Sequence, residues 1–494
     1  MTIHLSIVLF LPLATGVIGA FLPRGMARWA VLAGTVAVLA YVVAMLIDFE
    51  SGGGLQWVTD DEWISDLGIS YSLGVDGLNL FMIVLTAVAW VPCTLVAAFT
   101  ELDRPRLFFF NLALAETAVL GAFMAQDLAL FIVFFDLMLV PFYFLIGGWG
   151  SGDRVRATTL FVIYTLSGSL LMMAAAIALG VLATPDGGEI SFSLAVLEQR
   201  SVPEGTQQWI VLLFALAFFV KAPLFPLHGW VPATYRSTSI PVLALLSAVL
   251  SKAGVYGFLR IVLPVMPEGS QHWQELFIIV AVFSILYGSF LAFSQDNIRL
   301  VVAYSSIAQL GFITLGIFAL EDKGAQGAVF QMLNHGLVVV PLFLIIGVIA
   351  ARAGGSESLR ELGGMAFRAP VLATLFLIVS FATLAMPGSA NFVGEILVLF
   401  GTFEDKFVYG LVASAGVVLA SVYMIRVFQR TMHNRPGEAV ESREIDGLHL
   451  AAVVPLVAVI VALGVYPNFV VHRTEKATTA AIAEATGAAQ VATR

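Results

Sequence analysis

The chain has 494 residues, of which 60% are hydrophobic and only 12% are charged, and its formal net charge is −9. Soluble globular chains carry about 25% charged residues, so this composition excludes an ordinary soluble protein and indicates one embedded in a membrane. The single cysteine, Cys93, excludes disulfides within the chain and clusters held by several of its own cysteines.

Fourteen apolar runs follow one another along the chain, and runs of about 20 apolar residues are typical of membrane-spanning helices. They lie near 3–21, 29–47, 78–99, 107–125, 128–147, 157–183, 208–226, 241–263, 275–293, 298–319, 328–350, 370–400, 407–428 and 448–470. The runs lack the period-two alternation of barrel strands, so we predict an all-α polytopic membrane protein with about 14 transmembrane helices. The first run has no basic start and no small-residue cleavage site, and we expect it to be retained as a helix.

Basic residues are divided unevenly between the loops. Fifteen arginines lie in or beside loops that follow odd-numbered runs, whereas loops after even-numbered runs hold only Arg200, Lys323 and Lys406. Because a Lys/Arg excess marks cytoplasmic loops, we expect both termini to face outward. The loop 48–77 then also lies outside, and its ISYSLGVDG stretch alternates as a short hairpin does. The tail 474–494 fits either a surface helix or a disordered segment.

Prolines interrupt two of the runs. The seventh run contains Pro223 and Pro226, and the twelfth contains Pro387 within MPGSANFVGE. Proline removes the hydrogen bond to the carbonyl four residues back, so the carbonyls of Phe219, Ala222 and Thr383 should lose their helical partners. Free backbone groups at membrane depth persist only beside protein or water.

The two interruptions have matching positions. Runs 4–8 and runs 9–13 form two sets of five, the interrupted run is fourth in each set, and an odd number of helices inverts the second set. Paired broken helices in inverted repeats indicate a transport pathway, whereas isolated prolines produce simple kinks. We therefore divide the chain into a three-helix region with the acidic outer loop (1–106), a first repeat (107–263), a second repeat (275–430) and a C-terminal helix with its tail (431–494).

Ionisable residues lie near the middle of several predicted spans. They are Asp136, Lys221, Lys252, His335 and Glu395, with His228 seven residues after Lys221. A charge at the bilayer centre costs about 2.5–3.5 kcal/mol on insertion scales, so such residues usually face a wet interior and mark ion paths or proton relays. A carboxylate about 4 Å from an ammonium group stabilises it by about 4 kcal/mol at an effective dielectric near 20, and its withdrawal would turn a buried lysine into a proton donor.

Each of these residues also has a purely structural interpretation. Asp136 and Lys221 fit a silent buried ion pair, His335 fits a hydrogen-bonded core histidine, and Glu395 fits a helix cap. Glu116, in the fourth run, fits packing or a local hydrogen bond and is the weakest candidate. Lys252 has no evident partner in the sequence, which favours a functional interpretation.

Seven stretches between about Ser72 and Arg430 resemble the antiporter-like M-type membrane subunits of proton-translocating NADH:quinone oxidoreductase, respiratory complex I. The stretches are SLGVDGLNLFMI, DLMLVPFYFLIGGWG, VKAPLFPLHGWVP, LSKAGVYGFLR, DNIRLVVAYSSIAQLGF, QMLNHGL and MPGSANFVGEILVLFG. The resemblance implies a fourteen-helix core with two inverted five-helix repeats. It also implies that Asp136 pairs with Lys221, and that Lys252, His335 and Glu395 continue a proton relay.

The same resemblance implies a multi-pass protein of the plasma (inner) membrane that neighbours L-type and N-type antiporter-like subunits and lipid, with no nucleic acid. Redox chemistry with NADH and quinone would occur elsewhere in the complex, on partners that carry FMN and iron–sulfur clusters, and this chain would hold no cofactor or metal of its own. Two alternatives stay open: a sodium/proton antiporter subunit of the multisubunit cation/proton type, and a passive membrane scaffold.

Several positions depart from the family pattern. Asp136 stands where the family usually has glutamate, so the side chain is one bond shorter, and Gln309 stands where histidine is common and cannot titrate. The usual Pro-Asp-Ala-His after the first break is here Pro232, Ala233, Thr234 and Tyr235. Glu395 favours the M type, because sister subunits usually carry lysine there.

Overall fold

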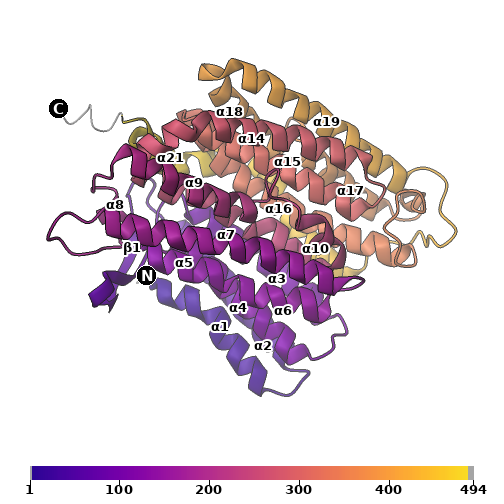
Figure 1. The fold of residues 1–494 in the computed structure, drawn as a ribbon. Helices are drawn as coiled ribbons and strands as arrows, with labels where there is room; N and C mark the ends of the chain where they lie inside the picture. Colours follow the sequence, from indigo (N-terminus) through magenta and orange to yellow (C-terminus); the bar gives the residue numbers. More distant parts are fainter. Residues whose placement is uncertain (1–2, 488–494) are drawn as a thin grey trace.

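The structure, a computed structural model that describes residues 3–487, is a bundle of long helices with one small two-stranded sheet (Figure 1). The helices of the N-terminal half are α1 (Leu5–Phe21), α2 (Ala27–Asp48), α3 (Leu80–Ala98), α4 (Pro105–Met124), α5 (Leu128–Leu137), α6 (Leu139–Trp149), α7 (Arg154–Leu182), α8 (Leu194–Leu197), α9 (Glu204–Lys221) and α10 (Val231–Ser237). The eighth run comprises α11 (Ile240–Leu245), a π-turn (Leu246–Leu250), α12 (Lys252–Gly257), a second π-turn (Phe258–Val262) and α13 (Leu263–Val265).

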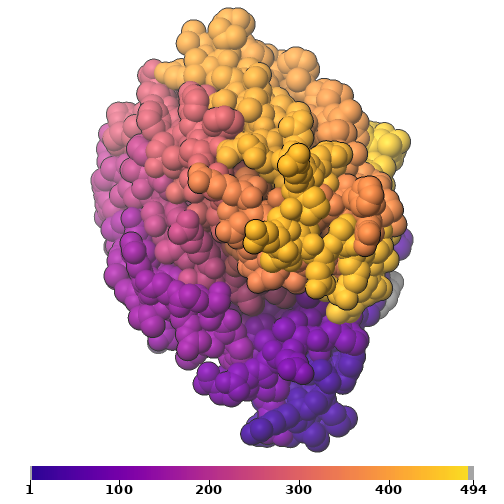
Figure 2. Space-filling model, turned by 90° about the vertical axis from the view of Figure 1, so that its right-hand side faces the viewer, coloured from indigo at the N-terminus to yellow at the C-terminus, as the bar shows by residue number. Residues whose placement is uncertain are grey.

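The C-terminal half continues with α14 (Pro267–Ser294), α15 (Ile298–Phe318), α16 (Asp322–Arg352), α17 (Pro370–Thr383), α18 (Ala390–Asp405), α19 (Phe407–Met432), α20 (Gly447–Val465) and α21 (Asn468–Thr486). Short 3-10 turns lie at Ser65–Leu67 and Met365–Phe367. In Figure 2 the indigo N-terminal segment lies at one end of the visible face, and the segment that follows residue 400 lies at the other.

Every predicted run contains helix, which confirms the all-α class. Among the described residues, eleven helical segments are long and apolar enough to cross a membrane, and α1 and α17 are shorter apolar helices. The prediction of about fourteen spans exceeds eleven because α1 is short and because the two interrupted runs are divided: α9 and α17 each end at a break, and α18 begins after one.

The centre of the bundle is formed by the eighth run together with α15 and α16. The apolar windows of these three segments are 100%, 94% and 94% buried, whereas those of α2, α19 and α20 are each 33% buried. The central helices are therefore covered by protein on all sides, and polar groups on them face other helices rather than lipid.

The predicted hairpin in the loop 48–77 is confirmed. Strands β1 (Gln56–Ile64) and β2 (Ile69–Val75) pair antiparallel, with Asp60 opposite Ser72 and Glu62 opposite Ser70. Gly68 precedes β2 with φ of 63°, and a Cβ there would lie 1.9 Å from the Ile190 carbonyl oxygen, so only glycine fits this turn.

Both predicted breaks are present. The helix α9 ends at Lys221 and helical structure resumes at Val231, and α17 ends at Thr383 while α18 begins at Ala390. The expectation that the Phe219 carbonyl lacks a partner is wrong: the Leu224 N–H donates to it at 3.0 Å, because the chain makes one wider turn past the proline. At the second break Gly388 has φ of 92°, a conformation that favours glycine.

Two irregularities were not predicted from the sequence. The fifth run is divided at Met138, where Pro141 has no N–H to donate to the Leu137 carbonyl, so α5 ends one residue after Asp136. In the eighth run, π-turns precede and follow α12, which begins at Lys252. Such turns are frequent at functional sites.

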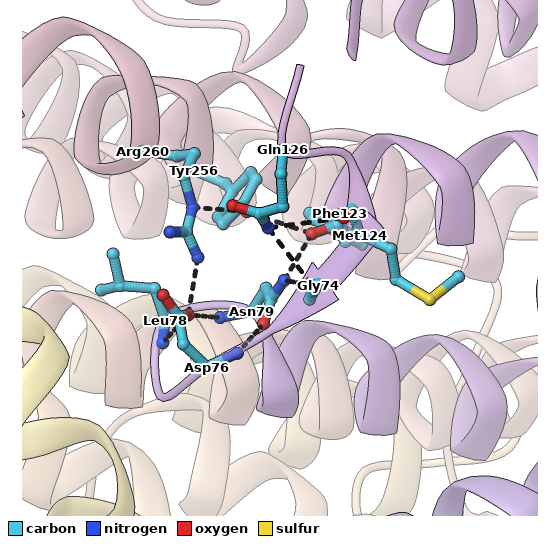
Figure 3. Close-up of polar contacts among 9 residues, drawn as sticks. All are labelled: Gly74, Asp76, Leu78, Asn79, Phe123, Met124, Gln126, Tyr256 and Arg260. Carbon is cyan, nitrogen blue, oxygen red and sulfur yellow. Dashed lines mark hydrogen bonds and ion pairs between the residues drawn. The ribbon is translucent and has the colours of Figure 1, made fainter. Parts of the chain in front are cut away.

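A polar cluster, drawn in Figure 3, ties the end of β2 to α4 and to the eighth run. Arg260 forms an ion pair with Asp76 at 2.6 Å and donates to the Tyr256 hydroxyl at 3.0 Å. Asn79 donates to the carbonyls of Gly74 and Phe123 at 2.9 and 2.8 Å. The cluster fixes the half of the eighth run that follows Lys252.

The tail is helical as far as it is described. The helix α21 covers Asn468–Thr486 and buries one side through Val470, Thr474 and Ala481. The rest of the predicted tail segment, 488–494, lies outside the described residues.

Candidate functional site

Lys252 and His335 are in direct contact at the centre of the bundle. The Lys252 Nζ lies 2.8 Å from His335 Nδ1, and it donates to the Ser247 carbonyl at 2.7 Å. The other ring nitrogen of His335 lies 3.2 Å from the Ser306 hydroxyl. Lys252 is fully buried and His335 is 4% exposed. The two groups can share one proton, because a second would place like charges side by side in a buried site.

The partner of Lys252 could not be found from the sequence. The π-turn before α12 brings the Ser247 carbonyl within reach of the lysine, and His335 comes from α16, 83 residues further along the chain. Ser247 and Ser306, whose hydroxyls are 3.4 Å apart, complete this cluster. Sequence reasoning missed both serines, since no local signal distinguishes them from other serines in apolar helices.

A second buried cluster surrounds Glu395. Gln309 donates its amide to Glu395 Oε1 at 2.7 Å, and Gln331 donates to Gln309 Oε1 at 2.6 Å. The three side chains are at most 3% exposed. The close approach of α16 to α18 depends on Gly394, because a Cβ there would lie 2.3 Å from Gln331 Oε1. Glu395 is thus a buried hydrogen-bonded acid, and Ser389 rather than Glu395 caps α18.

The two clusters are neighbours. Ser306 and Gln309 are three residues apart on α15, and Gln331 and His335 are four residues apart on α16, so each pair shares one helix face. The cluster that contains Lys252 and the cluster that contains Glu395 are therefore separated by one helical turn.

Asp136 and Lys221 are adjacent but do not form the expected ion pair. Among the described residues, the Lys221 Nζ donates to the Phe135 carbonyl at 3.1 Å and lies 4.2 Å from the centre of the Phe135 ring. The Asp136 carboxylate instead accepts from the Ser169 hydroxyl. Lys221 is 3% exposed, whereas Asp136 is half-buried. The shorter aspartate, held by serine, does not reach the lysine in this arrangement.

The weaker candidates have few contacts. His228 is 8% exposed, its Nδ1 has no hydrogen-bond partner among the described residues, and its ring lies 5.1 Å from that of Tyr287. Glu116 is fully buried and neither of its carboxylate oxygens has a partner within the described chain. A buried carboxyl group without a partner is costly, so Glu116 is a stronger candidate than its sequence context indicated.

Lys221 and Lys252 are not joined by a chain of hydrogen bonds within residues 3–487. Their helices do touch, since a Cβ on Gly254 would lie 2.6 Å from the Phe218 carbonyl oxygen. In the same part of the chain, no group of three or more His, Cys, Asp or Glu side chains could hold a metal ion.

Long apolar helices, two broken helices and a row of buried ionisable groups define a membrane protein of the antiporter-like type. Residues 125–421 match the family model described as NADH:quinone oxidoreductase/Mrp antiporter, TM. NADH-quinone oxidoreductase subunit M of Rhodobacter capsulatus is 35% identical over 486 residues, which cover 94% of each chain. The chain therefore belongs to the subunit M family of NADH-quinone oxidoreductases, the antiporter-like membrane subunits of complex I.

Solved structures agree with this assignment. A chain of respiratory complex I from Thermus thermophilus with bound NADH superimposes with a TM-score of 0.89 at 28% identity, covering 98% of this chain and 100% of that one. A chain of the Mrp complex from Dietzia sp. DQ12-45-1b gives a TM-score of 0.85 at 22% identity over 98% of this chain and 99% of that one, which shows a shared fold alone.

Proposed function

We propose that this chain translocates protons in the membrane arm of NADH:quinone oxidoreductase, along a row formed by Asp136, Lys221, Lys252, His335 and Glu395. The observation that carries the proposal is the buried contact between Lys252 Nζ and His335 Nδ1, 2.8 Å long and enclosed by protein. A buried amine beside a buried imidazole is a place where one proton can move between two bases.

The Lys252 step is a simple transfer. The ammonium group of Lys252 gives its proton to His335 Nδ1, which leaves a neutral amine and an imidazolium ion. The imidazolium ion then releases a proton from Nε2 toward Ser306, and the histidine returns to its neutral form. The Ser247 carbonyl holds the amine in place through the cycle.

At the first break, Lys221 serves as the proton holder. Phe135 and Asp136 are consecutive, so a change of side-chain conformation would carry the amine from the Phe135 carbonyl to the Asp136 carboxylate. Contact with the carboxylate would stabilise the ammonium form, and withdrawal to the carbonyl would favour proton release. Water would connect Lys221 with Lys252, and His228 is a further, weaker relay candidate.

The finer architecture belongs to the same proposal. Fourteen spans would include two inverted repeats, 107–263 and 275–430, between the three-helix region 1–106 and the C-terminal segment 431–494. Both termini would lie on the periplasmic or extracellular side of the plasma membrane. L-type and N-type subunits would flank the chain, and FMN and iron–sulfur clusters would be held by other subunits.

The test replaces Lys252 with alanine in the assembled complex and measures NADH-driven proton pumping in vesicles. We expect pumping to fall by about tenfold or more, as for loss of a group that transfers protons, while NADH oxidation by an artificial acceptor is unchanged. Lys406→Ala, which removes a lysine at the junction of α18 and α19, is the matched control and should pump normally. Normal pumping by an assembled Lys252→Ala complex would contradict the proposal, and pumping that depended on sodium would favour the sodium/proton antiporter alternative.

A further inference from the structure

Gln309 on α15 and Gln331 on α16 form a row of hydrogen bonds that ends at Glu395, and these hydrogen bonds have a definite direction. Gln331 Nε2 donates to Gln309 Oε1, and Gln309 Nε2 donates to Glu395 Oε1. This direction is the one that an ionised Glu395 at the end of the row requires, because a carboxylate accepts hydrogen bonds and cannot donate them. Every donor in this row therefore points toward Glu395.

Two oxygens in the same row have no hydrogen-bond partner among the described residues: Gln331 Oε1 and Glu395 Oε2. A carboxamide can turn over and exchange its oxygen and nitrogen positions without changing its shape. If both amides turned, Gln309 Oε1 would face Glu395, and Gln309 Nε2 would face Gln331 Oε1. The oxygen of Gln331 that is now without a partner would then accept a hydrogen bond.

We propose that Gln309 and Gln331 form a two-state amide switch whose direction follows the protonation of Glu395. In the observed state both amides donate toward an ionised Glu395. When Glu395 Oε1 gains a proton, its O–H donates to Gln309 Oε1, and Gln309 Nε2 donates to Gln331 Oε1. No covalent bond of either amide forms or breaks, and the only proton that is transferred is the one on Glu395.

The switch would lie beside His335, which belongs to the proposed relay. It rests on the proposed function only in assuming that Glu395 gains and loses a proton. His335 lies one turn from Gln331 on α16 and contacts Lys252, so a positive charge on that pair faces the row from one side. Tyr423 of α19 hydrogen bonds to Ser305, which is one turn from Gln309. Gln309 and Gln331 are thus positioning residues, which transfer no proton themselves.

A proton on Glu395 Oε2 is the competing arrangement. Asn391 lies one turn before Glu395 on α18, and both polar atoms of its amide are buried without a partner in the described chain. If the proton were on Oε2 and bonded to Asn391, the amides of Gln309 and Gln331 would not need to turn. The two arrangements predict that different substitutions shift the protonation of Glu395: those of Gln309 and Gln331 in the first, and that of Asn391 in the second.

The experiment follows the carboxyl band of Glu395 by infrared difference spectroscopy on the assembled complex as pH is varied, with Glu395→Gln to assign the band. Gln331→Met removes the far end of the row without touching Glu395. It should raise the pH of half-protonation by about one unit, because Gln331 supports Gln309 in both states but supports more strongly the row that ends on the ionised carboxylate, where the hydrogen bond is charge-assisted. Gln309→Met should raise it by about one to two units, and the double variant should match Gln309→Met alone.

Three results would overturn the switch: no shift in Gln331→Met, additive shifts in the double variant, or a shift only in Asn391→Leu. Gln274→Met, on α14, removes a glutamine that donates to the Phe318 carbonyl and is the matched control. Failure of the proton relay would be a separate result, namely normal pumping by Glu395→Gln, and the spectroscopic shift in Gln331→Met does not depend on it.

Discussion

The two halves of the proposed relay differ in how their charged groups are held. At the first break, Lys221 donates to a backbone carbonyl and Asp136 is half-buried and bound to a serine. In the centre, Lys252, His335 and Glu395 are all buried and hydrogen-bonded to side chains or backbone carbonyls of neighbouring helices. A group with one weak partner is free to change partners, whereas a continuous network of hydrogen bonds defines a path. The difference indicates that the first half controls transfer and the second half conducts it.

The largest expected effect comes from breaking the first half. Lys221→Ala and Asp136→Ala should each lower NADH-driven proton pumping by about tenfold or more, because each removes a group that binds the transferred proton. The measurement is vesicle acidification, with complex assembly checked by subunit content. Ser169→Ala removes only the hydroxyl that binds Asp136, so it should reduce pumping less than either change.

A double variant separates a role in proton transfer from a structural role of Lys221 and Asp136. Removing both charged groups at once leaves neither of them uncompensated, so two residues with only a structural role could be replaced in this way without loss of function. Lys221→Met with Asp136→Leu should therefore assemble but stay defective in pumping. Recovery of normal pumping in the double variant would mean that the pair has no role in proton transfer.

The next effect tests what holds the second half in place. Arg260, which lies eight residues after Lys252 on the eighth run, forms an ion pair with Asp76. The two side chains are 10% and 14% exposed. Arg260→Ala leaves a poorly solvated carboxylate without its partner, and we expect a loss of about 3–5 kcal/mol in the free energy of unfolding. Thermal unfolding of the purified complex, followed through loss of this subunit, would measure it.

The exposed pair of Lys323 and Glu404 is the control for that change, with side chains 56% and 43% exposed. Lys323→Ala should cost far less stability than Arg260→Ala, because ion pairs between exposed side chains contribute little. Equal losses in the two variants would show that the polar cluster around Arg260 and Asp76 does not stabilise the eighth run.

The sequence predicted the helices far better than their contacts. Runs of apolar residues indicate spans because a helix satisfies its own backbone, and Pro223 and Pro387 predicted the breaks because proline removes a local hydrogen bond. The Lys252 contact with His335, the amides around Glu395 and the π-turns could not be predicted in this way. They depend on which helix faces which, and side chains 83 or 86 residues apart in the chain determine them.

The expected pairing of Asp136 with Lys221 shows the same limit at short range. Composition placed both residues at membrane depth, but the length of one side chain and the presence of Ser169 decide which contact forms. Neither is visible in a hydrophobic pattern. Glu116 shows the opposite error. The sequence indicated packing or a local hydrogen bond, whereas the structure has a fully buried acid whose carboxylate oxygens have no partner among the described residues.

The smallest expected effect concerns a cavity of about 210 Å³ that lies between the eighth run and α21. Asp76, Arg260, Glu198 and Glu484 contribute to its walls. Burial raises the pKa of Glu198 to about 7 from its ordinary value of 4.5, and repulsion from Glu484 adds to the shift. The pKa of Glu484 is also raised by burial.

An acid with a raised pKa in the folded state binds its proton more tightly there than in the unfolded chain. Its contribution to stability is complete below pH 4.5 and is lost as pH rises through about 7. We therefore expect the packing of α21 against the eighth run to loosen modestly as pH rises from about 4.5 to about 7, and to change little above that. Hydrogen exchange of α21, corrected for the intrinsic effect of pH, would measure this change.

Glu198→Gln cannot ionise, so in that variant the exchange of α21 should vary less across the same interval. Pumping in Glu198→Gln should stay normal, because the residue lies outside the row of proton-transfer groups. A pumping defect in this variant would extend the proton path from Lys252 toward this cavity. The proposed relay would then have three parts: a first half that controls proton transfer, a second half that conducts the proton, and a third part that releases it.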